Sequence, residues 1–248
     1  MKIDIARQPL VPAFMTLFAL AVAAMCAGIP VSDTSGAVRD ALPLLGGQLA
    51  RFQAAYPVWS KFAAGFMLLF TGMCAGRITI RYNLYTVGTC LPIPLYAIVA
   101  CGIATGGNYL AGFAASMLLA LEKKNYCRAF CNGYGFDAIF RASLYLGLMP
   151  LVYAPALPLL LLLPLAVLLF RRTFREVVVA TAGLLLPIFT ACYVSWGSGA
   201  EFTAPLVTVG QSAIEGMPLQ LFLDIPLPAL VMACLLYTSP SPRDKRQS

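Results

Sequence analysis

Stretches of apolar residues alternate with short polar joints along this chain, and most charged residues lie in the joints. About 20 apolar residues in a helix cross the hydrocarbon core of a bilayer, and a helix satisfies its own backbone hydrogen bonds there. The pattern predicts an all-α, polytopic transmembrane helix bundle with roughly seven or eight spanning segments. The expected segments are 10–30, 57–76, 84–105, 108–122, 137–155, 156–170, 176–196 and 218–237. Of these, 108–122 and 156–170 are short, and we expect them to tilt or to pair as a re-entrant hairpin.

Composition agrees with a chain embedded in lipid. The chain has 248 residues, of which 60% are hydrophobic and only 11% are charged. Soluble domains are nearer half apolar and a quarter charged. Apolar runs such as Leu157 to Phe170 lack the two-residue alternation of barrel strands, which favours helices over a β-barrel.

The basic residues predict the orientation of the chain. With the N-terminus in the cytoplasm, eleven Lys and Arg residues fall in cytoplasmic joints and three on the opposite side. This bias follows the positive-inside rule and indicates a multi-pass protein of the bacterial inner membrane. The net charge of +7 therefore reflects topology, and we expect membrane lipids as partners and no nucleic acid. The eleven are Lys2, Arg7, Arg77, Arg81, Lys123, Lys124, Arg128, Arg141, Arg171, Arg172 and Arg175; the three are Arg39, Arg51 and Lys61.

The two ends of the chain call for separate interpretations. The first apolar segment is longer than the core of a usual signal peptide and has a poor cleavage site, so we expect a retained signal anchor. From Leu235 the sequence becomes LLYTSPSPRDKRQS, which resembles translated sequencing-adapter read-through. We therefore expect one transmembrane domain over residues 1–234, truncated at its C-terminus, and a non-native tail over 235–248. The alternative is an ordinary disordered basic tail.

Few residues have the pattern of a catalytic or metal site. The chain has no His, which excludes His-dependent triads, His-ligated metals and His proton relays. It has no Walker loop and no dinucleotide fingerprint. Cys127 and Cys131 are four residues apart in an expected cytoplasmic loop, but a metal site needs further ligands nearby. We expect incidental cysteines, no metal site and no cofactor.

Small residues and prolines predict details of helix packing. Gly72/Gly76 and Gly102/Gly106 have the GxxxG spacing that lets helices approach closely, within the bundle or between protomers. Prolines in the third, fifth and sixth segments predict kinked helices, either around a substrate groove or as tolerated structural features. These prolines are Pro92, Pro94, Pro150, Pro155, Pro158 and Pro164.

The first extracytoplasmic loop, 31–56, holds the candidate catalytic residues. Asp33 and Asp40 could act as general base or metal ligand on a lipid-phosphate substrate, and Arg39 or Arg51 could bind its phosphate. Residues 47–59 are expected to form a short interfacial helix, with aromatic side chains at headgroup depth. The alternative is a solvated loop without a catalytic role. Basic clusters at 122–128 and 171–176 are expected to bind anionic lipid headgroups on the cytoplasmic side.

The stretch from Phe136 to Phe189 carries a sequence resemblance. It combines an FDA entry, the pattern G-L-x-x-L-x-Y-x-P from Gly147 to Pro155, then Arg175-Glu176 and a G-x-x-x-P pattern that ends at Pro187. These motifs resemble an uncharacterised Bacteroidetes family of multi-spanning inner-membrane proteins, a domain of unknown function. The resemblance implies an envelope protein and transfers no catalytic residue.

Three function hypotheses remain open at the level of sequence. By architecture alone, the chain resembles glycosyltransferases and polymerases of cell-envelope glycan or lipid-linked saccharide metabolism. It could equally be a non-enzymatic scaffold or a subunit that binds other membrane proteins. Transport ranks behind, because intramembrane ionisable residues usually mark ion paths and only Asp224 is expected within a span.

Overall fold

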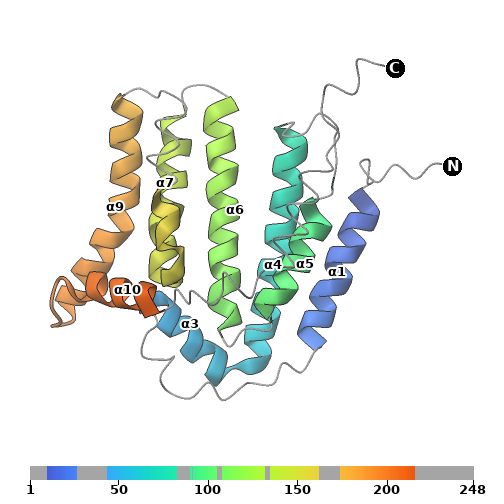
Figure 1. Ribbon diagram of the computed structural model, residues 1–248, viewed down its shortest axis with the longest axis horizontal. Coiled ribbons are helices and arrows are strands. Elements are labelled where there is room, and N and C mark those ends of the chain that lie inside the picture. The colour runs from blue at the N-terminus through green and yellow to red at the C-terminus, as the bar shows by residue number, and fades with distance from the viewer. Residues whose placement is uncertain are drawn as a thin grey trace. The chain divides into compact units, whose positions relative to one another are not determined.

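The computed structural model describes residues 10–26, 44–82, 90, 92–104, 108–131, 135–161 and 174–215, and every element among them is helical (Figure 1). This confirms the all-α prediction for the described part of the chain. All of these elements belong to one compact unit, Met1–Gly216. They are α1 (Leu10–Cys26), α3 (Leu44–Ala55), α4 (Pro57–Arg81), α5 (Pro92–Ala104), α6 (Tyr109–Cys131), α7 (Phe136–Val152), the 3-10 helix η1 (Ala154–Leu161), α9 (Phe174–Gly197) and α10 (Ala204–Glu215).

Two of the described helices, α4 and α9, are long and apolar enough to cross a membrane, judged by length and composition. They correspond to the expected segments 57–76 and 176–196. Helix α4 starts at a proline, which fits because the first helical residue needs no hydrogen-bonded N–H and its φ is already helical. The expected last segment, 218–237, and the boundary at 234/235 lie outside the described residues.

Two predicted segment boundaries were wrong. The expected loop after residue 122 is helical, because α6 continues without a break to Cys131 and carries the whole basic stretch. The helix expected from residue 84 starts later, since Cys90 lies outside a helix and α5 begins at Pro92. Pro92 and Pro94 therefore lie in a first turn, where a proline does not interrupt helical hydrogen bonds.

The expected sixth spanning helix, 156–170, also begins differently. After Val152, the chain leaves the α-helix at Tyr153 and continues as η1, which contains Pro155 and Pro158. Proline lacks an N–H and clashes with the preceding helical turn, so two prolines in quick succession disfavour a regular α-helix here. Residues 162–170 lie outside the described part of the chain.

The packing of the helices places α6 in the middle of the unit (Figure 1). One side of α6 packs against α7, which in turn packs against α9, and the other side packs against α4. Helices α1, α4 and α5 contact one another. Helix α3 contacts α4, α6 and α7, and α10 contacts α9 and η1. The fully buried side chains Leu17, Leu68, Ile93 and Phe113 fill the centre of the α1–α4–α5–α6 group.

Glycines allow close helix contacts on both sides of α6. A Cβ atom on Gly72 would meet the side chain of Leu17 in α1, and one on Gly76 would meet Ile93 in α5. The predicted Gly72/Gly76 pair thus packs within the bundle. The second pair was Gly102/Gly106, and Gly106 lies outside the described residues.

The backbones of α7 and α9 approach each other closely at two glycines. A Cβ on Gly147 would collide with the carbonyl oxygen of Leu184, and one on Gly183 would lie 2.7 Å from the carbonyl oxygen of Phe140. Each helix therefore presents a glycine to the backbone of the other. The missing side chains allow the two backbones to come together.

Candidate functional site

The candidate residues of the first outer loop are only partly described. Asp33, Asp40 and Arg39 lie outside the described residues. Arg51 lies exposed on α3. The short helix expected at 47–59 is present as α3, but it ends at Ala55, and Trp59 belongs to the long helix α4.

Polar contacts join α3, α4 and α6. The hydroxyl groups of Ser60 and Tyr109 are hydrogen-bonded at 2.6 Å, and both residues are buried. The Gln53 side-chain oxygen accepts a hydrogen bond from the Leu110 N–H at 3.3 Å, which satisfies one of the unpaired N–H groups at the start of α6. These contacts fix the beginning of α6 beside the beginning of α4.

The most unusual polar group in the described residues is Glu122, near the middle of α6. Its side chain is 0% exposed, although carboxylates are rarely buried without a partner. The nearest cation is Lys123 of the same helix, whose Nζ lies 3.5 Å from one carboxyl oxygen and whose side chain is half exposed. Apart from Lys123, neither carboxyl oxygen has a hydrogen-bond partner among the described residues.

Such an arrangement is costly for stability. Burial of an ionised carboxyl group costs several kcal/mol unless pairing and hydrogen bonds compensate. A single half-exposed lysine compensates only in part, since the attraction between partly solvated charges is weak. Folding alone does not explain why a glutamate lies here, and buried ionisable groups of this kind concentrate at functional sites.

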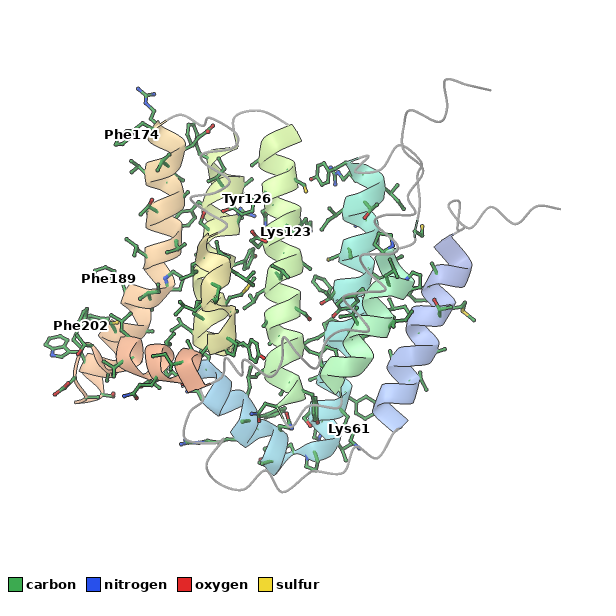
Figure 2. The ribbon with its side chains drawn as sticks, viewed as in Figure 1. Lys61, Lys123, Tyr126, Phe174, Phe189 and Phe202 are labelled. Carbon is green, nitrogen blue, oxygen red and sulfur yellow. The ribbon has the colours of Figure 1, made fainter. Side chains whose placement is uncertain are left out.

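The Tyr126 hydroxyl group connects this carboxyl group with a hydroxyl group of α7. Tyr126 follows Glu122 by one helical turn on the same face of α6 and interacts with Glu122 and with Ser143 of α7. Ser143 is fully buried and interacts with the Tyr126 side chain. Figure 2 shows Tyr126 and Lys123 on α6, toward the end of the helices that is opposite to Lys61 of α4. Glu122, Tyr126 and Ser143 form what we call the α6–α7 polar site.

The depth of this site follows from the alignment of α4 with α6. The two helices run in the same direction, and the Ser60–Tyr109 hydrogen bond aligns their beginnings (Figure 1). A span of about 30 Å that starts at Pro57 ends near Arg77. At about 1.5 Å per residue, Glu122 lies about 20 Å beyond Tyr109, which is about 6 Å short of the level of Arg77. Glu122 therefore lies at a level within this length of about 30 Å along α4, close to its end.

Sequence reasoning missed Glu122 because it was placed at the end of a span, next to two lysines. One signal could have identified it: Glu122 is the only acidic residue between Asp40 and Asp137. Glu176 of α9 is a second buried carboxyl group that was missed. Cys127 and Cys131 do lie on one helix, but the described residues contain no group of three or more His, Cys, Asp or Glu that could hold a metal ion.

Comparison with known proteins adds no family assignment. No protein-family model, no curated protein and no solved structure matches this chain.

Proposed function

We propose that the chain is a polytopic protein of the bacterial inner membrane with its N-terminus in the cytoplasm, as its seven or eight predicted segments suggest. The distribution of charge supports this topology. The described basic residues of α7, of α9 and of the later parts of α4 and α6 lie at one end of the helices, and Arg51 and Lys61 lie at the other (Figures 1 and 2). By the positive-inside rule, we assign the end with more basic residues to the cytoplasm.

Exposed apolar side chains give this proposal independent support. Phe174 and Phe189 of α9 are 81% and 61% exposed, and both point away from the other helices (Figure 2). Phe202 lies on the same side, after α9 ends. Large apolar patches are rare on soluble monomers and mark contact with lipid or another protein. In this proposal the outward face of α9 contacts lipid.

Site-directed labelling tests the orientation. Lys61→Cys and Arg128→Cys are made separately in a background from which the eight native cysteines have been removed. A membrane-impermeant maleimide added to intact spheroplasts should label Lys61→Cys and should label Arg128→Cys only after lysis. Labelling of both positions in intact cells, or of Arg128→Cys alone, contradicts the topology.

The activity that the described residues support best is transport coupled to a proton or a small cation. The buried carboxyl group of Glu122 carries this proposal, because ionisable residues inside spans are costly and mark ion and proton pathways. From sequence alone, transport ranked behind the other two hypotheses, because the charges before the last segment were expected to lie at helix ends. The buried Glu122 reverses that order. Tyr126 and Ser143 supply the hydroxyl groups that could exchange a proton or contact a cation beside the carboxyl group.

Proton flux into vesicles tests this activity. The purified protein is reconstituted into liposomes that contain pyranine, and a potassium diffusion potential, negative inside, is set with valinomycin. The wild-type protein should acidify the lumen and Glu122→Gln should not. Glu201→Gln removes an exposed carboxylate and serves as the matched control. Equal flux through both variants refutes the role of Glu122 in proton movement, and flux through the wild type no greater than that of empty liposomes refutes proton movement through the protein.

An enzyme of cell-envelope glycan or lipid-linked saccharide metabolism is the second candidate. The exposed Arg51 favours it, because α3 holds this side chain at the end of the helices assigned to the outer surface, where Tyr56 and Trp59 are also exposed. An arginine at headgroup depth can bind a lipid-linked phosphate. Loss of function in Asp33→Asn or Asp40→Asn, with normal insertion, would support catalysis; full function in both would refute it.

A scaffold or subunit role is the remaining alternative. In this proposal the outward face of α9, with Phe189 and Trp196, contacts another membrane protein in place of lipid. Stable co-purification with a defined membrane protein in mild detergent would support it, and a monodisperse protein without a partner would contradict it.

A further inference from the structure

Four exposed cations gather where α4 and α6 reach the end assigned to the cytoplasm. Arg77 and Arg81 are one turn apart on α4, and Lys124 and Arg128 are one turn apart on α6. Residues four apart lie on the same face of a helix. Each helix thus presents a pair of positive charges, and we call the four residues the α4–α6 cationic cluster.

The alignment of the two helices places both pairs at the same level. Ser60 and Tyr109 are hydrogen-bonded at the beginnings of α4 and α6. Arg77 follows Ser60 by about five turns, and Lys124 and Arg128 follow Tyr109 by about four and five turns. Lys124 and Arg77 both interact electrostatically with the Cys74 side chain, so one cation of each pair lies near this residue.

No carboxylate neutralises this cluster within the described part of the chain. The Glu122 carboxylate is paired with Lys123 at 3.5 Å, and the Asp137 carboxylate with Arg141 at 3.0 Å. None of the four cations of the cluster has a described carboxylate within 4.0 Å. The cluster is therefore available for an anion from outside the chain.

An apolar stripe on α4 leads to the cluster. Phe66, Phe70 and Met73 precede Arg77 by eleven, seven and four residues, a spacing that lines them up along one helix face. Phe66 and Met73 are exposed, and the rings of Phe66 and Phe70 are stacked with centroids 6.3 Å apart. A ligand with a phosphate at one end and a hydrocarbon chain at the other matches this combination.

We propose that the α4–α6 cationic cluster binds the headgroup of an anionic phospholipid, whose acyl chain lies along the Phe66–Phe70–Met73 stripe. This inference rests on the membrane topology proposed above. Arginine binds phosphate through two parallel hydrogen bonds, and basic residues near the cytoplasmic leaflet attract anionic lipids. General attraction to the leaflet would involve every cytoplasmic cation equally, whereas this site depends on two particular helices.

Native mass spectrometry of the intact protein tests the site. The protein in mild detergent is titrated with dioleoyl phosphatidylglycerol or with dioleoyl phosphatidylcholine, which has the same chains and no net charge. The wild type should retain the anionic lipid preferentially. Each lost contact should weaken its binding about 5-fold, so that Arg77→Gln/Lys124→Gln should bind it roughly 25-fold more weakly. Phe66→Ala/Met73→Ala should weaken binding of both lipids.

The control removes two other cations from the same end of the helices. Arg141→Gln/Arg175→Gln should change binding less than 2-fold; an equal loss in both double variants would show general attraction and overturn the site. Competition by millimolar glycerol phosphate, with no effect of Phe66→Ala/Met73→Ala, would show a soluble phosphate ligand and also overturn it. Maleimide labelling of the same variants separates this test from the topology: correct orientation with unchanged lipid binding refutes the lipid site alone.

Discussion

The close approach of α7 and α9 makes a quantitative prediction for Gly147→Ala. The added Cβ would collide with the carbonyl oxygen of Leu184, an atom that cannot rotate away as a side chain could. Overpacking costs typically about 1–3 kcal/mol, and a backbone obstacle argues for the upper end. Alanine also favours a helix over glycine by about 1 kcal/mol. The free energy of unfolding should therefore fall by about 2 kcal/mol.

Thermal unfolding in detergent measures this effect through the fluorescence of the two tryptophans. For a chain of this size, about 2 kcal/mol corresponds to a fall in Tm of about 4–8 °C. Gly210→Ala in α10 is the matched control, because a Cβ there meets nothing within 4 Å and only the helix preference remains. Its Tm should rise by about 2–4 °C.

Gly183→Ala extends the test to the other helix of the same contact. Its Cβ would lie 2.7 Å from the Phe140 carbonyl oxygen and 3.2 Å from the Ser143 Cβ, so its Tm should also fall. The two effects should not add in the double variant, because the first substitution already forces the helices apart. If Gly147→Ala raised the Tm as much as Gly210→Ala does, the proposed backbone contact would be wrong.

Two further substitutions compare buried with exposed polar contacts. Tyr109→Phe removes one partner of the buried 2.6 Å hydrogen bond and leaves the Ser60 hydroxyl with its bond to the Pro57 carbonyl. The free energy of unfolding, measured in detergent, should fall by about 1 kcal/mol. No change would mean that the bond contributes nothing to stability. Asp137→Asn removes an exposed ion pair with Arg141 on α7 and should cost less than about 0.5 kcal/mol, with the difference vanishing in 1 M salt; a larger loss that salt leaves unchanged would contradict this assignment.

Hydrophobicity predicted the helices that are apolar along their whole length. Both ends of helix α9 lie within two residues of the expected ends, because the apolar run in the sequence has the same limits as the helix. The end of α6 was misplaced because Lys123 and Lys124 were taken as the start of a loop. Long basic side chains can extend from a continuing helix toward water, so charge alone does not end a helix.

The candidate site was less predictable because it depends on contacts between distant segments. Nothing in the local pattern shows that Glu122 is buried, since its burial follows from the packing of α6 between two neighbours. Helix α10 was not expected, because its apolar stretch is too short to register as a span. Gly147 and Gly183 were noticed only as parts of separate motifs, although they meet in one contact.

The pairing of α7 with α9 also bears on how the chain is synthesised. Leu184, the partner of Gly147, leaves the ribosome well after α7 is complete, and the intervening segment must be translated first. At roughly 5–20 residues per second, the delay is on the order of a few seconds. During that time the glycine face of α7 lacks the helix that packs against it in the folded protein, so something other than α9 must cover it. Biogenesis of this protein thus includes a waiting step, and slower translation between α7 and α9 would lengthen it.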